Sequence, residues 1–445
     1  ADPIDADQKL QEDALMSYVA SVNYSYGDKY YASFSFRRDG SSRLSPETRW
    51  GNFWSLSGSW RLSQEKFMQP LKSVLSDLKL RASYGVNGNL PSSYYGYQST
   101  YTTEKFYNGK PSPWESTLGN EQLTWEKNYA LNLGLDIGLF SRVNISLDWY
   151  TRTTKDLLMS KQLNSISGFS SLLTNVGEMR NTGVELEVRS NNIKTDDFSW
   201  TTAFNLSHNE NKILKLADLP WFVEDRYIHK EGYPFNTIYL REYAGVDPET
   251  GSALYYDNRQ NEDGTYTKNP VTDPGKANPI PLKDITPTIS GGFMNTFNYK
   301  FIDLSFNLSY SFGGYSYDNA AYILQDDGYS ITSNKSTEQR RRWQKPGDIT
   351  DVPRFVYGNK KGGNYNSSRA IHSTDHIRLK SLILGLNAPK AWMKKIGVNN
   401  ARIYFSGTNL LTWAAYDQYD PEMSGVVGFY TPPLKTYAFG LELKF

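Results

Sequence analysis

The sequence contains no cysteine, and this absence excludes several kinds of site. None of the 445 residues is Cys, so disulfides, thiolate metal ligands and cysteine nucleophiles are excluded. An excess of one charge is also missing, because 48 Lys and Arg stand against 47 Asp and Glu. A balanced charge argues against nucleic-acid binding through a general basic face. No segment approaches the roughly 18 consecutive apolar residues of a transmembrane helix.

Aromatic residues, by contrast, are abundant. They make up 15% of the chain, with 33 Tyr and 11 Trp, while all hydrophobic residues together reach only 38%. Mean hydropathy is −0.60. This combination is rare in soluble helical enzymes. It is typical of two classes, sugar-binding β proteins and outer-membrane β-barrels.

Hydrophobicity alternates with a period of two along most of the chain, which predicts β-strands. At the end of the chain, for example, Tyr437, Phe439 and Leu441 alternate with Ala438 and Gly440. The predicted strands have about 9–12 residues, longer than the usual 5–6 of globular sheets and suited to a tilted membrane crossing. A soluble sandwich is the alternative, but strand length and aromatic positions favour an all-β transmembrane antiparallel β-barrel. We predict thirteen strands, near residues 15–26, 30–38, 50–61, 78–85, 129–140, 143–154, 182–190, 198–210, 288–299, 304–312, 375–386, 399–408 and 435–445.

The connections between these strands alternate in length. Outer-membrane barrels have short periplasmic turns and long extracellular loops. If Phe445 lies at the periplasmic end and the strands alternate in direction back along the chain, every long connection lies on the extracellular side. The long connections are 86–122, 155–181, 211–287, 313–374 and 409–434, and the short ones include 27–29, 141–142, 191–197 and 300–303.

Two segments depart from the simple pattern. Residues 234–246 have strand character, but a single crossing there would reverse the parity. We therefore expect 211–287 to stay wholly outside, with a hairpin of its own. In 375–386 the apolar phase changes between Leu379 and Leu382, which predicts a β-bulge near Lys380 and Ser381.

The parity also bears on the extent of the barrel. The first predicted strand descends from an outside connection, and an odd number of strands is unusual in bacterial single-chain barrels. We therefore expect residues 1–445 to be the C-terminal part of a single larger barrel, whose first strands are absent from this chain.

No catalytic constellation is found in the sequence, so we expect no catalytic residue, no cofactor and no metal. His372 and His376 have a metal-like i, i+4 spacing but lie on no convincing helix. Residues 258–264 resemble a calcium loop faintly, and a plain turn explains them better.

Ligand binding is better supported, through the predicted outer loops. Sugars stack on aromatic faces and hydrogen-bond to Asn, Asp and Arg, and the loops supply both kinds of residue. The alternative is that loop aromatics pack loops together or contact a partner protein. Trp149, Trp200 and Tyr437 lie on apolar strand faces, which predicts an interfacial girdle. The candidate ligand-binding residues are Trp114, Trp221, Asp225, Arg226, Tyr227, Tyr239, Arg241, Asp326, Asp327, Tyr329, Tyr416 and Asp417.

Short sequence blocks, spread over nearly the whole chain, carry a family resemblance. The chain resembles the SusC/RagA family of TonB-dependent outer-membrane transporters of Bacteroidetes. Among the matching blocks are Arg37-Arg38-Asp39-Gly40-Ser41-Ser42-Arg43, Leu78-Lys79-Leu80-Arg81-Ala82-Ser83-Tyr84-Gly85, Asn181-Thr182-Gly183-Val184-Glu185, Gly245-Val246-Asp247-Pro248-Glu249-Thr250-Gly251, Arg378-Leu379-Lys380 and Asp420-Pro421-Glu422.

The resemblance implies a barrel of about 22 strands in the bacterial outer membrane. It also implies an N-terminal plug domain, energy from TonB and a SusD-like surface lipoprotein over the outer mouth. We expect the plug and the contact with TonB to be absent from this chain. The implied function is active import of an oligosaccharide, without an enzymatic step. The alternatives are a peptide importer of the same family, a soluble carbohydrate-binding or glycan-cleaving β protein, and a passive porin.

Overall fold

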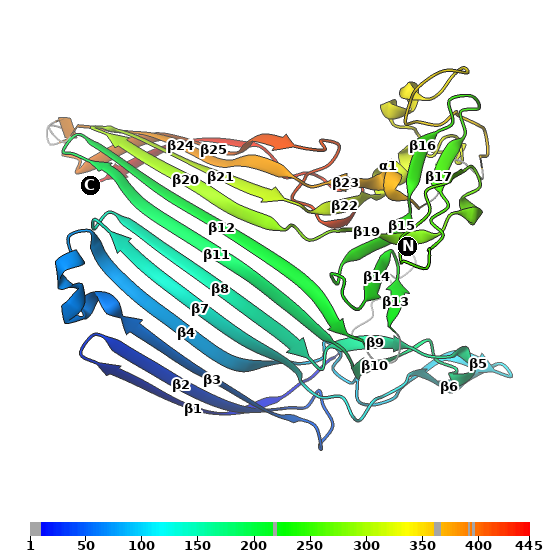
Figure 1. The fold of residues 1–445 in the computed structure, drawn as a ribbon, viewed down its shortest axis with the longest axis horizontal. Helices are drawn as coiled ribbons and strands as arrows, with labels where there is room; N and C mark the ends of the chain where they lie inside the picture. Colours follow the sequence, from blue (N-terminus) through cyan, green and yellow to red (C-terminus); the bar gives the residue numbers. More distant parts are fainter. Residues whose placement is uncertain (1–9, 217–219, 360–365, 390–391, 394–396) are drawn as a thin grey trace. The chain divides into compact units, whose positions relative to one another are not determined.

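The computed structural model describes residues 10–216, 220–359, 366–389, 392–393 and 397–445. Its main feature is an antiparallel sheet of 13 strands, in which successive long strands of the chain are neighbours (Figure 1). The strands of this sheet are β1 (Leu15–Tyr26), β2 (Tyr30–Ser41), β3 (Trp50–Arg61), β4 (Leu75–Asn89), β7 (Glu126–Leu139), β8 (Val143–Lys155), β11 (Glu178–Lys194), β12 (Phe198–Lys215), β20 (Ile289–Tyr299), β21 (Ile302–Phe312), β24 (His376–Asn387), β25 (Asn400–Ala414) and β27 (Thr436–Lys444).

The thirteen predicted strands are confirmed, and several are longer than the alternation suggested. β4 runs from Leu75 to Asn89 rather than over 78–85, and β12 continues to Lys215. Several of the extra residues of β4 are polar, yet Asn87 and Asn89 still pair with β7. Backbone hydrogen bonds continue beyond the apolar band because they do not depend on side-chain hydrophobicity.

The predicted β-bulge is confirmed in β24. The pairing with β21 and the pairing with β25 both shift register at the same place, between Leu379 and Ser381. Lys380 is the extra residue, and it restores the apolar phase for Leu382 and the residues after it.

The long connections form small sheets of their own. β12 pairs directly with β20, so residues 216–288 add no strand to the main sheet, as predicted for this connection. The small strands are β5 (Thr100–Tyr107), β6 (Lys110–Thr117), β9 (Leu158–Gln162), β10 (Ser171–Asn175), β13 (Trp221–Glu224), β14 (Tyr227–Lys230), β15 (Thr237–Arg241), β16 (Tyr243–Val246), β17 (Ala253–Tyr256), β18 (Pro270–Val271), β19 (Pro279–Asp284), β22 (Tyr315–Asp318), β23 (Ile371–Ser373) and β26 (Gly425–Val427).

Helices are few and short. Within the described residues, no helix has the length and apolar character needed to cross a membrane. The helices are α1 (Asn319–Leu324) and the 3-10 turns η1 (Leu62–Gln64), η2 (Lys66–Leu71), η3 (Ser165–Ser167), η4 (Pro274–Lys276), η5 (Thr337–Arg341) and η6 (Ser368–Ala370).

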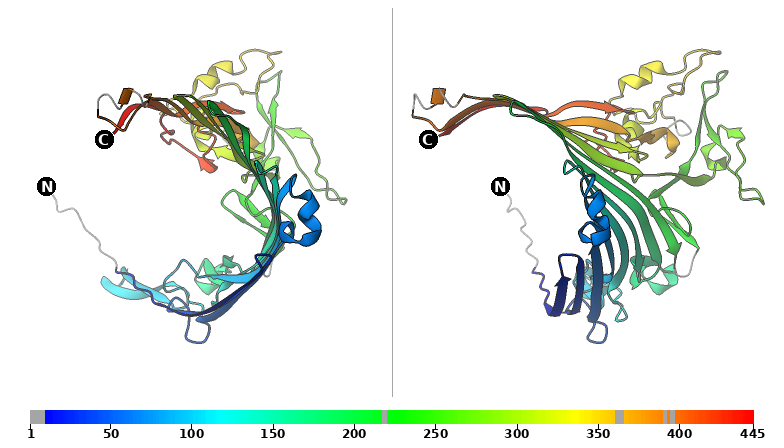
Figure 2. Two further views of the ribbon diagram at one scale, coloured as in Figure 1. Left: turned by 90° about the vertical axis from the view of Figure 1, so that its left-hand side faces the viewer. Right: turned by 60° about the vertical axis from the view of Figure 1, so that its left-hand side comes forward.

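Contacts divide the chain into two compact units. Unit 1 comprises residues 1–185 and 210–220, and unit 2 comprises 186–209 and 221–445. Figure 2 shows the strands of each unit from two further sides.

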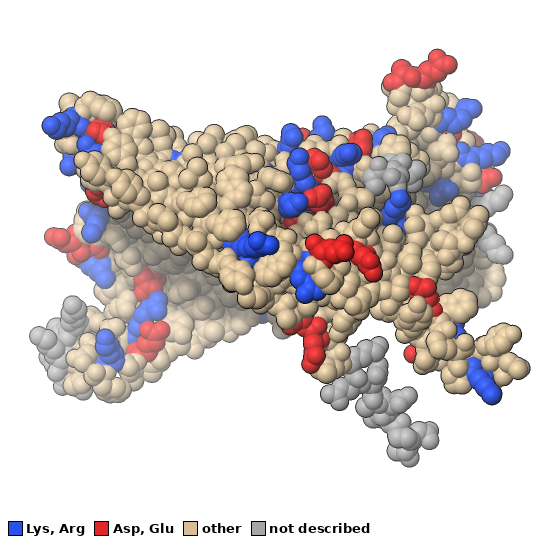
Figure 3. All heavy atoms as spheres, turned by 90° about the horizontal axis from the view of Figure 1, so that it is seen from below, with Lys and Arg blue, Asp and Glu red and all other residues tan. Residues whose placement is uncertain are grey.

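In unit 1 the sheet has an apolar face open to its surroundings. Leu56 and Leu133 are about half exposed, at 55% and 47%, on strands that alternate with Ser and Asn. Figure 3 shows a broad uncharged area, with charged atoms mainly at the left edge and over the right-hand part. A long apolar sheet face that no other layer covers is the surface expected against lipid.

The packed core of unit 1 lies beyond the apolar band, where β3 and β4 meet the loops. Phe53 and Trp125 pack edge to face with ring centroids 5.2 Å apart. The indole of Trp125 donates to the Arg49 carbonyl at 2.8 Å, which fastens the loop after β2. Leu44 and Leu123 complete this cluster and are fully buried.

Unit 2 has its cores in the small sheets of the loops. Ile238 and Leu240 of β15 pack against Tyr317 of β22 and Ala370. A second cluster surrounds Tyr255, which is fully buried. These cores give the loops a defined structure, on which the candidate residues are placed.

Candidate ligand-binding site

Eleven of the twelve candidate residues lie in unit 2, and Trp114 lies in unit 1. Trp114 stands on β6 of the β5–β6 hairpin with 55% of its surface exposed. The Lys105 ammonium lies 4.6 Å from its ring centre. An exposed indole beside a cation can stack on a ligand ring or on a partner side chain.

Trp221 of β13 and Tyr239 of β15, the strands on either side of β14, form an aromatic pair. Their ring centres are 6.3 Å apart with the planes inclined at 47°, and Trp221 is 46% exposed. Asp225 follows in the β13–β14 turn with a positive φ of 51°. Its exposed carboxylate pairs with Arg226 at 3.0 Å. This corner of the loops therefore presents aromatic faces with a carboxylate in the neighbouring turn.

Arg226 and Tyr227 face the interior of the loops rather than solvent. The Arg226 guanidinium lies 4.6 Å from the ring centre of Tyr317. Tyr227 packs against the cluster around Ile238, and burial raises the pKa of Tyr227 above its ordinary value. Both residues hold β13–β15 against β22.

Tyr416 belongs to a buried polar junction. Its hydroxyl donates to Asp318 at 2.9 Å, and its ring stacks on His372 at 3.7 Å with an interplanar angle of 2°. Burial lowers the pKa of His372 and raises that of Tyr416. Both side chains are therefore neutral at pH 7. Asp417, the next residue, is exposed.

Asp326 and Asp327 are buried and occupied by internal partners. Asp326 accepts a hydrogen bond from Lys335 Nζ at 2.7 Å. Asp327 accepts two from the Arg369 guanidinium, at 2.6 and 3.2 Å. These contacts order the loop after α1. Tyr329, two residues on, remains 51% exposed.

Arg241 is also committed to its own loop. Its Nε donates to the carbonyls of Pro274 and Ala277 at 2.8 and 3.1 Å. The structure therefore separates the candidates into two groups. Those facing solvent are Trp114, Trp221, Asp225, Tyr329 and Asp417, with Tyr239 partly exposed beside Trp221.

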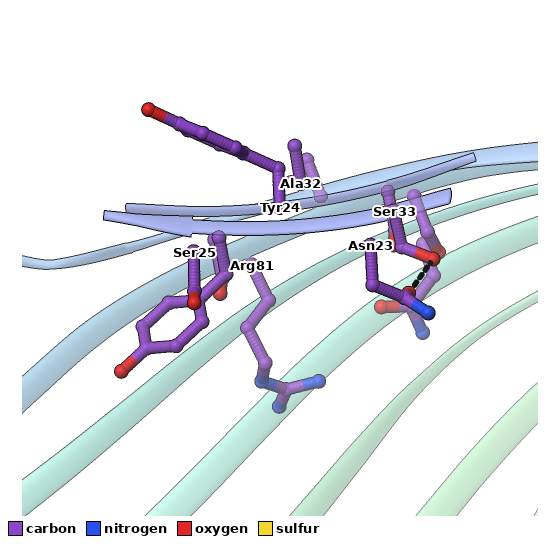
Figure 4. Close-up of a pocket in the computed structure, with 13 residues that line it drawn as sticks. Asn23, Tyr24, Ser25, Ala32, Ser33 and Arg81 are labelled. Atoms are coloured by element: carbon purple, nitrogen blue, oxygen red, sulfur yellow. Dashed lines mark hydrogen bonds between the residues drawn. The ribbon is translucent and has the colours of Figure 1, made fainter. Parts of the chain in front are cut away.

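The polar face of the unit 1 sheet offers a second candidate surface. A hollow of about 430 Å³ lies on β1–β4 and β7. In Figure 4, Ser25, Ser33 and Arg81 point to one side of the strands, while Tyr24 and Ala32 point to the other. One register row across these strands consists of Asn23, Ser33, Ser57, Ser83 and Asn132.

Arg81 carries the charge of this polar face. Its guanidinium donates to Asp136 at 2.9 and 3.0 Å and to Asp148 at 3.0 and 2.9 Å. Gly134 lies on β7, the strand between β4 and β8. A Cβ added to Gly134 would lie 2.5 Å from the guanidinium carbon of Arg81. One cation and two carboxylates give this site a net negative charge, and a polar ligand can form charge-assisted hydrogen bonds with it.

In unit 2 an ionic cluster ties the last long loop to the polar face of β24. Arg378, 2% exposed, donates to Asp420 at 2.7 Å and to Glu422 at 2.9 Å. Lys380 reaches the same Glu422 at 2.5 Å. The loop after β25 is thereby folded onto the strands.

These two ionic clusters were not among the predicted site residues. Arg81, Asp136 and Asp148 occupy polar positions in alternating strands, so charged residues on that phase were the available signal. Their mutual contact depends on strand register, which alternation alone does not give.

Possible metal ligands form no site in the part of the chain described. No group of three or more His, Asp or Glu side chains there could hold an ion. His376 instead lies within hydrogen-bond distance of the Thr374 carbonyl, 2.8 Å from Nδ1. Residues 258–264 form a turn in which Asn261 and Thr265 are hydrogen-bonded.

A long antiparallel sheet with one lipid-type face and one polar face defines the class as an outer-membrane β-barrel protein. Residues 4–238, more than half of the chain, match the family described as TonB dependent receptor-like, beta-barrel. The chain belongs to this family, and within it to the SusC/RagA type. It is an outer-membrane protein.

Named relatives agree with this assignment. TonB-dependent receptor P3 of Formosa agariphila is 32% identical over 98% of this chain and 46% of that protein. TonB-dependent receptor SusC of Bacteroides thetaiotaomicron is 30% identical over 99% of this chain and 45% of that protein. The RagAB peptide transporter structure has a TM-score of 0.87 at 31% identity, covering 97% of this chain and 48% of that chain. The chain thus spans about half the length of the relatives it matches.

Proposed function

We propose that this chain is the C-terminal barrel wall of a TonB-dependent importer that moves an oligosaccharide inward across the outer membrane. The loops capture the ligand, the polar face lets it pass, and TonB supplies the energy. This mechanism involves no chemical step at a catalytic centre. Exposed Trp221 and partly exposed Tyr239, with Asp225 in the adjoining turn, carry the glycan assignment.

The polar face supports passage of a hydroxyl-rich ligand. Its register row of Asn and Ser side chains presents donors and acceptors without deep apolar pockets. A moving sugar can exchange such hydrogen bonds one for another at small net cost. Arg81 and its two carboxylates add stronger contacts at one level.

We also propose three components beyond residues 1–445. β1 is exposed along its whole length and ends the sheet, as β27 does at the other end. Unpaired strand edges of this length are a liability in a membrane. Further strands, roughly nine in a barrel of 22, and an N-terminal plug domain would complete the wall. A SusD-like lipoprotein would cover the loops.

Uptake by the full-length protein tests the assignment. Cells carrying it would be given defined oligosaccharide and peptide pools, and depletion followed by mass spectrometry with and without a proton gradient. We expect oligosaccharides to be consumed only with the gradient present. Equal uptake with and without the proton gradient would contradict active import and favour a passive pore.

Binding by a Trp221→Ala variant tests the aromatic pair. We expect the affinity for the oligosaccharide to fall about fivefold, since stacking on an aromatic face is worth on the order of 1 kcal/mol. Trp392→Ala is the matched control, because Trp392 is 65% exposed in the short connection between β24 and β25. Equal losses in both variants would count against Trp221 as a contact.

A peptide importer is the second candidate function. It is favoured by the similarity to the RagAB peptide transporter. Backbone amides of a peptide would use the same Asn and Ser row. Depletion of peptides but not oligosaccharides in the uptake assay would select this candidate.

A further inference from the structure

The connection between β3 and β4 has an unusual surface. Within residues 62–74, Phe67 is 64% exposed, Leu71 52% and Val74 47%. Phe67 and Leu71 lie on η2, and Val74 follows η2 in the same connection. Figure 2 shows the turns η1 and η2 in blue, standing to one side of the unit 1 strands. A water-facing turn would normally carry polar residues at such positions.

Glu65 fixes this segment to the apolar side of the sheet. Its carboxylate accepts from Tyr30 Oη at 2.6 Å and from Trp60 Nε1 at 3.2 Å. Tyr30 and Trp60 are neighbours on the lipid-type face, with ring centres 6.2 Å apart. The hydrogen bonds to Tyr30 and Lys29 hold the pKa of Glu65 at about 2, so the carboxylate is charged at neutral pH. The C-terminal end of the connection is held by a hydrogen bond, which the Phe140 N–H donates to the Val74 carbonyl at 2.7 Å.

The same two aromatic residues border an apolar hollow. It has a volume of about 690 Å³ and lies on the lipid-type face of unit 1. Its lining combines small residues with larger apolar ones. Its lining includes Tyr30, Gly58, Trp60, Ala82, Leu133 and Trp149.

Two lysines flank the exposed apolar residues. Lys66 and Lys72 are exposed, and among the described residues neither has an ion-pair partner. Lys29, by contrast, is paired with Glu65 at 2.9 Å. Long basic side chains beside an apolar helix face can extend to lipid phosphates while their stems stay in the apolar layer.

We propose that residues 62–74 are an interfacial anchor for an anionic phospholipid of the leaflet at the short-turn end of the barrel. Phe67, Leu71 and Val74 insert between acyl chains, and Lys66 and Lys72 bind the lipid phosphate. One acyl chain occupies the hollow beside Trp60. The site is continuous with the lipid-facing surface, which distinguishes it from a docking surface for a soluble protein.

Depth measurement in the full-length protein tests the insertion. An environment-sensitive fluorophore on Phe67→Cys would be read in phospholipid vesicles with nitroxides at shallow or deep acyl positions. We expect strong quenching by the shallow nitroxide, a result that a water-exposed turn would not give. The same label on Tyr107→Cys, 80% exposed in the β5–β6 hairpin, provides the aqueous control. Identical emission and no quenching at both positions would overturn the proposal.

Lipid retention tests the lysines and the source of the phosphate. Native mass spectrometry would count phosphatidylglycerol retained by wild type, by Lys66→Gln/Lys72→Gln, and by the control Lys105→Gln/Lys110→Gln. We expect at least a threefold loss in the first variant only, with no competition from inorganic phosphate at millimolar concentration. Unchanged retention, or displacement by inorganic phosphate alone, would count against a lipid site.

Discussion

At the scale of single residues, Gly134 matters because the Arg81 guanidinium crosses above it from β4 to reach Asp148 on β8. A methyl group there would meet the guanidinium at 2.5 Å. The side chain of Arg81 is flexible, so it would move aside and give up the Asp148 contact. The strands themselves would keep their register.

We expect Gly134→Ala to be less stable than Gly58→Ala by about 1 kcal/mol, the upper range for a partly exposed ion pair. Gly58 is the matched control, because the nearest atom to an added Cβ there is 3.8 Å away. Both substitutions also remove glycine flexibility from the unfolded chain, so their difference isolates the contact. Urea unfolding of the reconstituted full-length protein measures it, and equal midpoints would refute this role of Gly134.

Arg378 differs from Arg81 in being almost fully buried. Its removal leaves Asp420 without the cation that pairs with it, while Glu422 keeps Lys380. The side chain of Asp420 is only 6% exposed, so its charge would be costly to keep in place.

We expect Arg378→Gln to cost about 3 kcal/mol and to release the loop after β25. Limited proteolysis within residues 415–434 should be faster, with fragments identified by mass spectrometry. Arg402→Gln is the control, because Arg402 and Asp303 form a more exposed pair. Its expected cost is about 1 kcal/mol or less. An unchanged rate of cleavage in Arg378→Gln would show that other contacts hold the loop after β25 in place.

At the scale of elements, the small strands of unit 2 depend on neutral buried groups. β23 presents His372 to the Tyr416 ring, and burial lowers the pKa of His372 below its ordinary value. The nearby Asp318 opposes this effect without cancelling it. The unfolded chain therefore binds more protons than the folded one just below pH 6.5.

Stability should accordingly rise with pH through this window and fall on acidification. We expect the melting temperature to drop between pH 7.5 and pH 5, and to drop less in His372→Gln. Part of the drop should remain in the variant, because burial also lowers the pKa of His229. Calorimetry at both pH values measures the difference, and an identical drop in wild type and variant would exclude His372 as a contributor.

The β5–β6 hairpin is an element of the opposite kind, since nearly all of its side chains are exposed. We expect deletion of residues 100–117 to leave barrel folding intact, as judged by heat-dependent mobility in gels. Because Trp114 and Tyr107 would be lost, co-purification of a surface lipoprotein should decrease. Normal folding with unchanged co-purification would show that the hairpin is not part of the surface that binds the lipoprotein.

At the scale of the whole molecule, the two end strands of the sheet decide what can fold. Residues 1–445 alone expose the edges of β1 and β27. We expect this chain by itself to yield no heat-modifiable monomer in detergent, whereas the full-length protein should yield one. A stable monomeric barrel formed by residues 1–445 alone would contradict the proposal of further strands.

The sequence alone was enough for the thirteen strands of the main sheet and their order, though not for the full length of each. Alternating residues such as Leu131 and Leu133 identify a two-faced strand, because the side-chain period of a strand is two. The phase change after Leu379 located the bulge for the same reason. Motif blocks then indicated the family, since they are spread through most of the chain.

Only the tertiary structure could decide which candidate residues face solvent. Trp221 and Asp327 looked alike as loop residues of binding type, yet Trp221 is exposed and Asp327 is buried against Arg369. The contacts of Arg81 with Asp136 and of Glu65 with Tyr30 likewise join residues that lie 55 and 35 positions apart. Such contacts depend on strand register and loop packing, and alternation within one strand carries no information about either.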